Sequence, residues 1–165
     1  MALMDRLRID GKVAIVTGAG RGVGRGIALA LAEGGATVVC SARTRSEIDD
    51  TVREITGNGG RALAITADVM QESELRALVD ATLERFGKVN ALINNVGWGE
   101  YTPLWDVSMD YMVKSYILNT VSAYNLSKLC MPHLKQQDNA SITISGSAVG
   151  TTPSPEFISY SNAKA

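Results

Sequence analysis

Short apolar runs alternate along this chain with longer segments in which apolar residues recur every three or four positions. The short runs are rich in Val, Ile and Ala and meet glycine or polar residues, a pattern typical of buried β-strands. Segments with helical spacing separate them, and the last of these predicts a long helix over about residues 110–135. The predicted strands cover residues 12–17, 36–40, 62–66, 89–94 and 141–145.

This alternation predicts an α/β fold in which parallel strands form one sheet with helices on both faces. Right-handed crossovers favour the doubly wound arrangement of a Rossmann domain, with five strands present. The chain contains no linker, repeat or low-complexity tract. We therefore expect residues 1–165 to form a single domain.

Composition and charge narrow the classes of function. Apolar residues make up 45% of the 165 residues and charged residues 20%, with a formal net charge of −1. Because no basic stripe is present, nucleic acid is not expected as a partner. Residues 1–12 mix charges with short apolar pairs, and no segment has the apolar length of a signal peptide or a membrane span. We therefore expect no membrane partner.

Cysteine and histidine are scarce. Cys40 and Cys130 are the two cysteines, and His133 is the one histidine. They lack the spacing of a metal site, so no metal is expected. We interpret the cysteines as reduced, half-buried thiols of a cytoplasmic protein and His133 as a helix-surface residue.

A glycine-rich turn, Thr-Gly-Ala-Gly-Arg-Gly-Val-Gly at residues 17–24, joins the first predicted strand to the first predicted helix. Such a turn points backbone N–H groups and the positive end of the helix at an anion. Glycines suit it because a Cβ would block the sharp bend and the close approach of a pyrophosphate. A glycine-rich connection that binds nothing is the alternative. The position between strand and helix favours dinucleotide binding by Gly18, Arg21, Gly22, Val23 and Gly24.

The end of the second predicted strand bears on which dinucleotide is bound. In NAD-specific sites an acidic residue there takes the ribose 2′-hydroxyl. This chain reads Cys-Ser-Ala-Arg at residues 40–43, with no carboxylate before Glu47. Arg43, with Arg21 as a second candidate, could instead bind a 2′-phosphate through paired donors. We therefore expect NADP(H), with NAD(H) possible; two solvated surface arginines are the alternative.

Tyr160 and Lys164 are four residues apart, so on a helix they share one face. A free tyrosine is a poor base at neutral pH because its pKa is about 10. A neighbouring ammonium group, joined by the positive charge of an oxidised nicotinamide, stabilises the phenolate. Tyr160 can then exchange a proton with a substrate hydroxyl or carbonyl while a cofactor carries the hydride. Taken alone the pattern is common, and a surface tyrosine beside a surface lysine is the alternative.

Four motifs occur together in the order found in one enzyme family: the glycine turn, Asn-Asn-x-Gly at 94–97, a serine after the fifth strand, and Tyr-x-x-x-Lys at 160–164. On these motifs the sequence resembles the short-chain dehydrogenase/reductase family over nearly its whole length. The resemblance implies an oxidoreductase that transfers a hydride between NADP(H) and a small-molecule alcohol or carbonyl substrate. It also implies a homo-oligomer, a dimer or tetramer, that pairs through the long helix and the lysine's helix.

The same resemblance assigns roles around Tyr160, the acid/base, and Lys164, which also binds the nicotinamide ribose. Ser147 would hydrogen-bond the substrate oxygen, with Ser145, placed within the fifth strand, as the competing serine. Asn119 matches the family's active-site asparagine, which helps to hold a proton-relay water behind the lysine. On position alone, Asn119 fits an ordinary polar residue of a helix equally well.

Other residues are assigned to the cofactor and the substrate mouth. By resemblance, Asp68 and Val69 would lie against the adenine ring, and Asn95 and Gly97 would shape the end of the fourth strand beside the cofactor. Residues 98–101, with two aromatic side chains, would line the substrate mouth or simply cover the sheet.

Members of the family continue well past the lysine, so the domain is expected to be incomplete at its C-terminus. We expect a short helix from about Glu156, an open edge at the fifth strand, and no turnover by these 165 residues alone. A non-catalytic dinucleotide-binding fragment or regulator is the alternative to an enzyme. Epimerase or dehydratase chemistry is a third possibility, less favoured because the glycine turn and the tyrosine are close in sequence.

Overall fold

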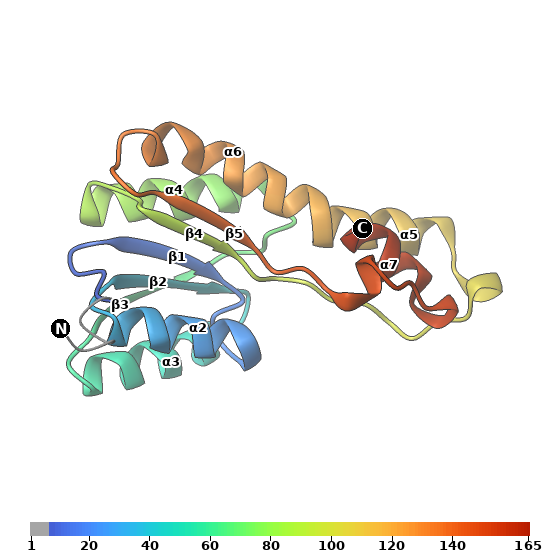
Figure 1. Ribbon diagram of the computed structural model, residues 1–165, viewed down its shortest axis with the longest axis horizontal. Coiled ribbons are helices and arrows are strands. Elements are labelled where there is room, and N and C mark those ends of the chain that lie inside the picture. Colours follow the sequence, from blue (N-terminus) through green and yellow to red (C-terminus); the bar gives the residue numbers. More distant parts are fainter. Residues whose placement is uncertain (1–6) are drawn as a thin grey trace.

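Five parallel strands form one sheet in the computed structural model, which describes residues 7–165. Residues 1–6, part of the charged N-terminal stretch and of the expected single domain, lie outside the described residues. The sheet order is β3-β2-β1-β4-β5, and every neighbouring pair is parallel (Figure 1). This confirms the predicted α/β Rossmann fold. The strands are β1 Val13–Thr17, β2 Thr37–Ala42, β3 Arg61–Thr66, β4 Ala91–Asn94 and β5 Ser141–Ile144.

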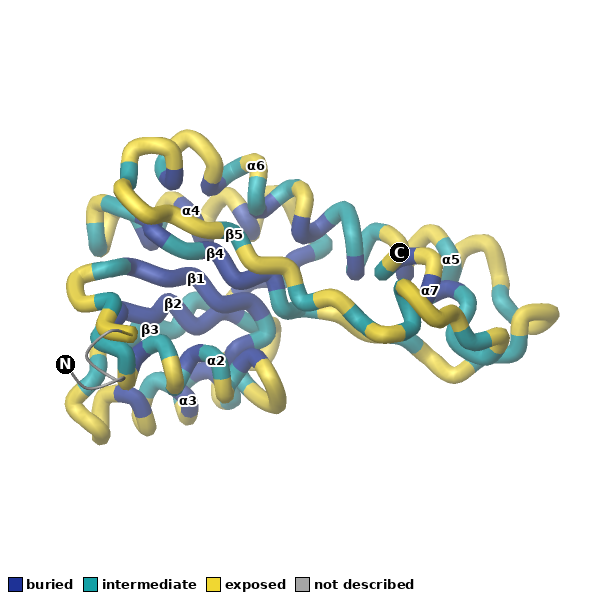
Figure 2. Tube along the Cα trace, viewed as in Figure 1, coloured by how far each residue is buried: buried dark blue, intermediate teal, exposed yellow. Residues whose placement is uncertain are grey.

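Helices cover both faces of the sheet, because the central strands carry apolar side chains on both sides. On β1, Ile15 packs with the cluster under α4 and α6, whereas Val16 packs with the cluster under α2 and α3. Figure 1 shows these two pairs of helices on opposite faces, and Figure 2 shows the central strands buried and β5 exposed. The helices are α2 Gly22–Glu33, α3 Arg45–Gly57, α4 Glu72–Phe86 and α6 Ser122–Leu134.

The strand order reverses at β1. The chain passes from β1 through β2 to β3 on one side, and then crosses over to β4 and β5 on the other. The loops after β1 and β4 therefore diverge at the carboxyl ends of the strands, the edge where doubly wound proteins bind ligands. The glycine turn and the Asn-Asn-x-Gly segment both begin at this edge.

The long helix predicted over residues 110–135 is present but is not one regular helix. It begins as α5 (Met109–Tyr116), widens into a π-helical turn (Ile117–Val121) and continues as α6. The amide of Ser122 bonds the carbonyl of Ile117, five residues back, which defines the wider turn. The prediction of an uninterrupted α-helix was wrong at this turn.

The tyrosine-lysine segment lies beyond the carboxyl ends of the strands, beside α5 (Figure 1). The helix expected from about Glu156 starts as a 3₁₀ turn, Pro155–Phe157, and only then becomes α7 (Ile158–Lys164). Pro155 stands at the first position of this turn, where a proline is tolerated because that N–H has no partner inside a helix. The 3₁₀ turns Leu104–Asp106 and Ala148–Gly150 lie in the same projecting part.

Both cysteines are free and have no exposed side-chain surface, rather than being half-buried as expected. Cys40 packs between the sheet and α2–α3, and Cys130 packs between the sheet and α4. Burial raises the pKa of each thiol to about 12.

Within residues 7–165, no helix combines the length and the apolar character needed to cross a bilayer.

Candidate functional site

The glycine turn between β1 and α2 has the tight backbone that its sequence predicted. Gly18 and Gly22 have φ angles of 66° and 54°, in the left-handed region where glycine is favoured. A Cβ at Gly24 would lie 2.2 Å from the carbonyl oxygen of Gly18. The turn thus folds back onto the start of α2, with the Val23 side chain pointing to solvent at 72% exposure.

Asn95 joins this turn to the end of β4. Its amide Nδ2 donates to the carbonyl of Thr17 at 3.0 Å, and its backbone N–H donates to the Thr17 hydroxyl at 3.0 Å. The Thr17 hydroxyl in turn donates to the carbonyl of Ile93 at 3.3 Å. The two predicted cofactor-binding segments are therefore held together across the switch point of the sheet.

Arg21 and Arg43 are both exposed at this edge. Arg21 precedes the first turn of α2, and Arg43 follows the last residue of β2. Among residues 7–165 neither guanidinium has a salt-bridge partner, whereas the nearby Arg25 and Arg45 are paired with carboxylates. Both are therefore available to bind an anion.

Asp68 and Val69 follow β3 at the same edge of the sheet. The Asp68 carboxylate accepts a hydrogen bond from the amide of Met70 at 3.0 Å, which closes the turn locally. Val69 is buried in the core cluster under α4. The Val69 side chain contributes mainly to the core, and the adenine-side location of both residues stays a prediction.

Lys164 is the centre of the second group of candidate residues. Its ammonium Nζ donates to the carbonyl of Ser145, just after β5, at 2.9 Å. It lies 5.8 Å from the centroid of the Tyr160 ring. Partial burial lowers the pKa of Lys164 below its ordinary value. One turn of α7 therefore holds a half-buried cation beside a phenol.

Asn119 and Gly97 complete this group. A Cβ at Gly97 would lie 3.0 Å from Oδ1 of Asn119 and 3.1 Å from Nζ of Lys164, so both side chains converge on this glycine. Asn119 is 4% exposed and sits in the π turn. A Cβ at the next glycine, Gly99, would lie 2.6 Å from Cβ of Tyr160. The segment after β4 therefore contacts all three of Asn119, Tyr160 and Lys164.

Two serines follow β5. Ser147 precedes the 3₁₀ turn Ala148–Gly150, and a Cβ at Gly150 would lie 2.4 Å from the carbonyl oxygen of Lys164, so this turn packs on the end of α7. Within residues 7–165 the Ser147 hydroxyl has no hydrogen-bond partner. Ser145 lies one residue beyond β5 rather than inside it, and its hydroxyl is 3.5 Å from Oδ1 of Asn95.

Aromatic rings extend from Tyr160 to the surface. The ring of Phe157 lies 6.4 Å from that of Tyr160 and 4.9 Å from that of Tyr101, in edge-to-face geometry. The amide of Thr102 donates to the carbonyl of Glu156 at 2.8 Å and holds the two segments together. Tyr101 is 68% exposed. Tyr101, after β4, and Phe157, before α7, thus form an aromatic rim next to Tyr160.

Two residues that sequence reasoning missed also contact α7. The hydroxyl of Ser115 donates to the carbonyl of Ser159 at 3.2 Å, and that of Thr120 donates to the carbonyl of Ala163 at 2.6 Å. Both donors lie on the long helix within five residues of Asn119. A cluster of small polar residues in an otherwise apolar helix was the available signal.

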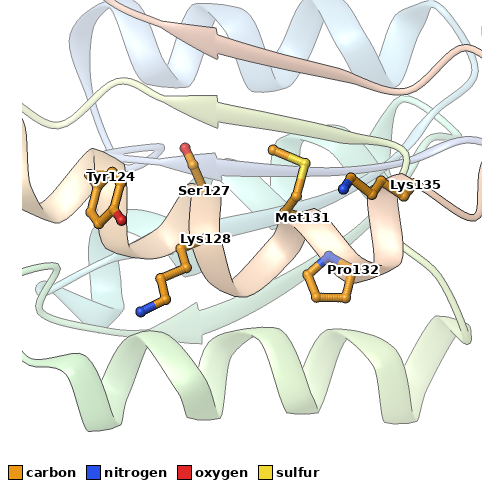
Figure 3. A pocket seen from close by; sticks show the side chains of 6 residues that line it. All are labelled: Tyr124, Ser127, Lys128, Met131, Pro132 and Lys135. Atoms are coloured by element: carbon orange, nitrogen blue, oxygen red, sulfur yellow. The ribbon is translucent and has the colours of Figure 1, made fainter.

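An open groove lies elsewhere, along α6 (Figure 3). All of its residues follow the π turn, so the groove and the candidate site use different parts of the long helix. Among residues 7–165 no group of three or more potential metal ligands lies together. The groove is lined by Tyr124, Ser127, Lys128, Met131, Pro132 and Lys135.

Comparison with known proteins gives consistent matches. The profile of the short chain dehydrogenase family matches residues 12–165. The 7alpha-hydroxysteroid dehydrogenase of Escherichia coli K12 is 38% identical over 161 residues, which are 98% of this chain and 63% of that enzyme. A versicolorin reductase of Emericella nidulans is 34% identical over 165 residues, 99% of this chain and 62% of that enzyme. The chain thus spans somewhat less than two thirds of the length of these relatives.

Solved structures of dehydrogenases also match this chain over nearly its whole length. A 7 alpha-hydroxysteroid dehydrogenase complexed with NADH and 7-oxo glycochenodeoxycholic acid superimposes with a TM-score of 0.94 at 37% identity. That match covers 99% of this chain and 64% of the solved one. A dehydrogenase/reductase from Sinorhizobium meliloti 1021 has a TM-score of 0.93 at 29% identity, covering 98% of this chain and 64% of that one.

Proposed function

Because the chain belongs to the short-chain dehydrogenase family, we propose that it is the cofactor-binding and catalytic part of an NADP(H)-dependent oxidoreductase. The reaction interconverts an alcohol and a ketone. One observation carries this proposal: Lys164 and Asn119 converge on Gly97, and Tyr160 lies against Gly99, at the carboxyl ends of the strands. Doubly wound sheets bind ligands at this edge.

The glycine turn suits a dinucleotide. The first turn of α2 contains no acidic residue and has no side-chain cap, so its N–H groups remain available to a pyrophosphate. Gly18, Gly22 and Gly24 allow the backbone to approach closely. In this proposal Val23 flanks the pyrophosphate, Asp68 and Val69 lie on the adenine side, and Asn95 and Gly97 lie on the nicotinamide side.

Tyr160 transfers the proton. The bound dinucleotide would supply the hydride. During ketone reduction the Tyr160 hydroxyl donates its proton to the substrate oxygen, and the Lys164 cation stabilises the phenolate that remains. Ser147, whose hydroxyl has no protein partner in the described structure, donates a hydrogen bond to the same oxygen. Asn119 supports the lysine side of the site.

NADP(H) is the proposed cofactor because Arg43, at the end of β2, and Arg21, in the glycine turn, are exposed and have no salt-bridge partner among residues 7–165. No carboxylate occupies the end of β2, and Glu47 packs instead on Gly20 of the turn, where a Cβ would lie 3.0 Å from its Oε2. A planar guanidinium binds phosphate oxygens in pairs. NAD(H) remains the second candidate, since the similar solved structure carries NADH.

The proposed partners are a small-molecule alcohol or carbonyl substrate and a second copy of the protein. The relatives carry names as different as 7alpha-hydroxysteroid dehydrogenase and L-fucose dehydrogenase. Exposed apolar side chains on α5, including Met109, Val113 and Tyr116, favour self-association. The free, buried thiols fit a reducing cytoplasm.

Turnover of the protein, purified at the length its gene encodes, tests this proposal. Ketone-dependent oxidation of NADPH across a carbonyl panel should be measurable, and Tyr160→Phe should reduce it by a factor of about 100 to 10,000. Tyr124→Phe, on α6, is the matched control and should retain activity. Binding of NADPH without turnover of any carbonyl would instead favour a non-catalytic dinucleotide-binding protein.

A further inference from the structure

The π turn changes which residues of the long helix face the rest of the site. The Ser122 amide bonds the carbonyl of Ile117, so the carbonyl of Leu118 loses the donor that an α-helix would give it. The Ser122 hydroxyl donates to that carbonyl at 2.6 Å instead. A side chain thus stabilises the wider turn, which indicates a feature built into the sequence rather than a local irregularity.

Within this turn, neighbouring side chains contact different parts of the site. Asn119 points to the segment after β4: its Oδ1 accepts from the amide of Trp98 at 2.9 Å, and its Nδ2 donates to the carbonyl of Trp98 at 2.9 Å. Thr120, the next residue, donates its hydroxyl to the carbonyl of Ala163 in α7 at 2.6 Å. The turn therefore holds the segment after β4 with one residue and the tyrosine-lysine helix with the next.

The contact to α7 matters because of the residues that it adjoins. Thr120 donates to the Ala163 carbonyl, which belongs to the peptide bond that leads directly into Lys164. One turn earlier, the Ser115 hydroxyl donates to the carbonyl of Ser159, next to Tyr160. The long helix thus holds α7 at two points, four residues apart.

We propose that Thr120 is a positioning residue for Lys164. Through the Ala163 carbonyl it holds the turn at residues 160–164 where Nζ of Lys164 reaches the Ser145 carbonyl and remains 5.8 Å from the Tyr160 ring. This inference rests on the proposed function for its catalytic consequence. The geometric contact does not depend on it.

Substitution of the hydroxyl tests the proposal. Thr120→Val has nearly the same shape but removes the hydroxyl that donates to the Ala163 carbonyl. It should lower kcat for ketone reduction about tenfold or more while KM for the ketone changes less than about twofold, because misplaced catalytic groups reduce the chemical step. Thr120→Ser keeps a hydroxyl and should restore kcat to within about threefold of the unsubstituted protein.

Thr82→Val is the matched control. Thr82 is fully buried in α4 and donates its hydroxyl to the carbonyl of Leu78 at 2.7 Å, far along the chain from α7. This substitution should lower the unfolding temperature and leave kcat within about twofold. Unchanged kcat in Thr120→Val, or a Thr120→Ser variant no better than Thr120→Val, would overturn the proposal.

A readout without turnover separates this inference from the proposed function. Amide hydrogen exchange over Ile158–Lys164 should be about tenfold faster in Thr120→Val than in the unsubstituted protein, with exchange in α4 unchanged. Thr120→Ser should show the slower rate. Unchanged exchange over α7 would overturn the positioning role even if the protein reduces ketones. Faster exchange in a protein without activity would retain the contact and reject the proposed reaction.

Discussion

At the scale of single residues, neighbouring arginines on and beside α3 differ in their partners. Arg45 forms a bifurcated contact with Asp49, with its one Nε 2.8 and 2.9 Å from the two carboxylate oxygens. Arg43, two residues earlier, is exposed and has no such partner among residues 7–165. The two side chains therefore provide a matched pair for testing which charge binds the cofactor.

Arg43→Ala should weaken NADPH binding about tenfold to a hundredfold, since a hydrogen bond to a charged group contributes about 1.5–3 kcal/mol. The dissociation constant for NADH should change less than about twofold. Arg45→Ala should affect neither cofactor. Fluorescence titration of both dinucleotides checks this, and equal losses for NADPH and NADH in Arg43→Ala would reject the 2′-phosphate assignment.

Lys164, a proposed catalytic residue, carries an electrostatic cost of burial. Burial lowers its pKa in the folded protein below the ordinary value of 10.5. Between the two pKa values the unfolded chain binds more protons than the folded one, so folding stability rises with pH across that interval. Burial of the charge therefore lowers stability most at pH values below both pKa values, where the charge is present in both states.

The lowered pKa of Lys164 predicts how pH changes the stability of the unsubstituted protein relative to Lys164→Met. The unsubstituted protein should gain free energy of unfolding relative to Lys164→Met as pH rises from 7 toward 10.5, because the variant lacks the group that loses its proton. Denaturant unfolding of both proteins at several pH values measures the difference. A difference that stays constant, or that moves in favour of the variant, would contradict a lowered pKa.

At the scale of elements, regular patterns were predictable and close tertiary contacts were not. All five strands were predicted to within two residues at each end, because apolar runs buried on both faces have few alternatives. The π turn was missed, since it depends on the hydroxyl of Ser122 bonding its own helix. The 3₁₀ start of α7 was missed although Pro155 was a visible signal.

The candidate site, too, was predictable where it depends on local spacing and not where it depends on tertiary contacts. The glycine turn and the pairing of Tyr160 with Lys164 follow from spacing within one element, and spacing is visible in sequence. The convergence of Asn119 on Gly97 joins residues of the long helix and the segment after β4, and no local pattern encodes that distance. The Thr120 contact with α7 depends on the same wider turn and was equally hidden.

Two glycines of the α2 segment should respond in opposite ways to an added methyl group. Gly24→Ala would place Cβ 2.2 Å from a backbone oxygen, so it should destabilise the protein by about 1–3 kcal/mol and abolish NADPH binding. Gly26→Ala meets no atom within 4 Å and should stabilise the helix by up to about 1 kcal/mol. Thermal unfolding with and without NADPH compares them. Tight NADPH binding by Gly24→Ala would show that the turn does not hold the cofactor as proposed.

At the scale of the whole molecule, apolar side chains are exposed on α5 and at β5. Val113 and Tyr116 of α5 are 54% and 52% exposed, and Ile144 of β5 is 58% exposed. Patches of this kind on a folded protein commonly mark contacts with other chains or segments. The long helix is the part of the structure that the family resemblance assigns to subunit pairing.

We expect self-association through α5 to raise the molecular mass measured in solution. Sedimentation of the protein should give a multiple of the chain mass, and Val113→Asp should shift it toward the single chain by placing a charge in an apolar contact. Leu7→Asp, at an apolar residue 58% exposed near the N-terminus, is the control and should not change the mass. An unchanged mass in Val113→Asp would place the contact elsewhere.

Transfer of deuterium from NADPH labelled at C4 to a ketone tests the central claim most directly. The account predicts that the product alcohol made by the unsubstituted protein carries deuterium at the former carbonyl carbon, and that Tyr160→Phe forms this product at least about a hundredfold more slowly. Mass spectrometry of the product measures both. NADPH that binds but transfers no deuterium to any carbonyl tested, or undiminished transfer by Tyr160→Phe, would contradict it.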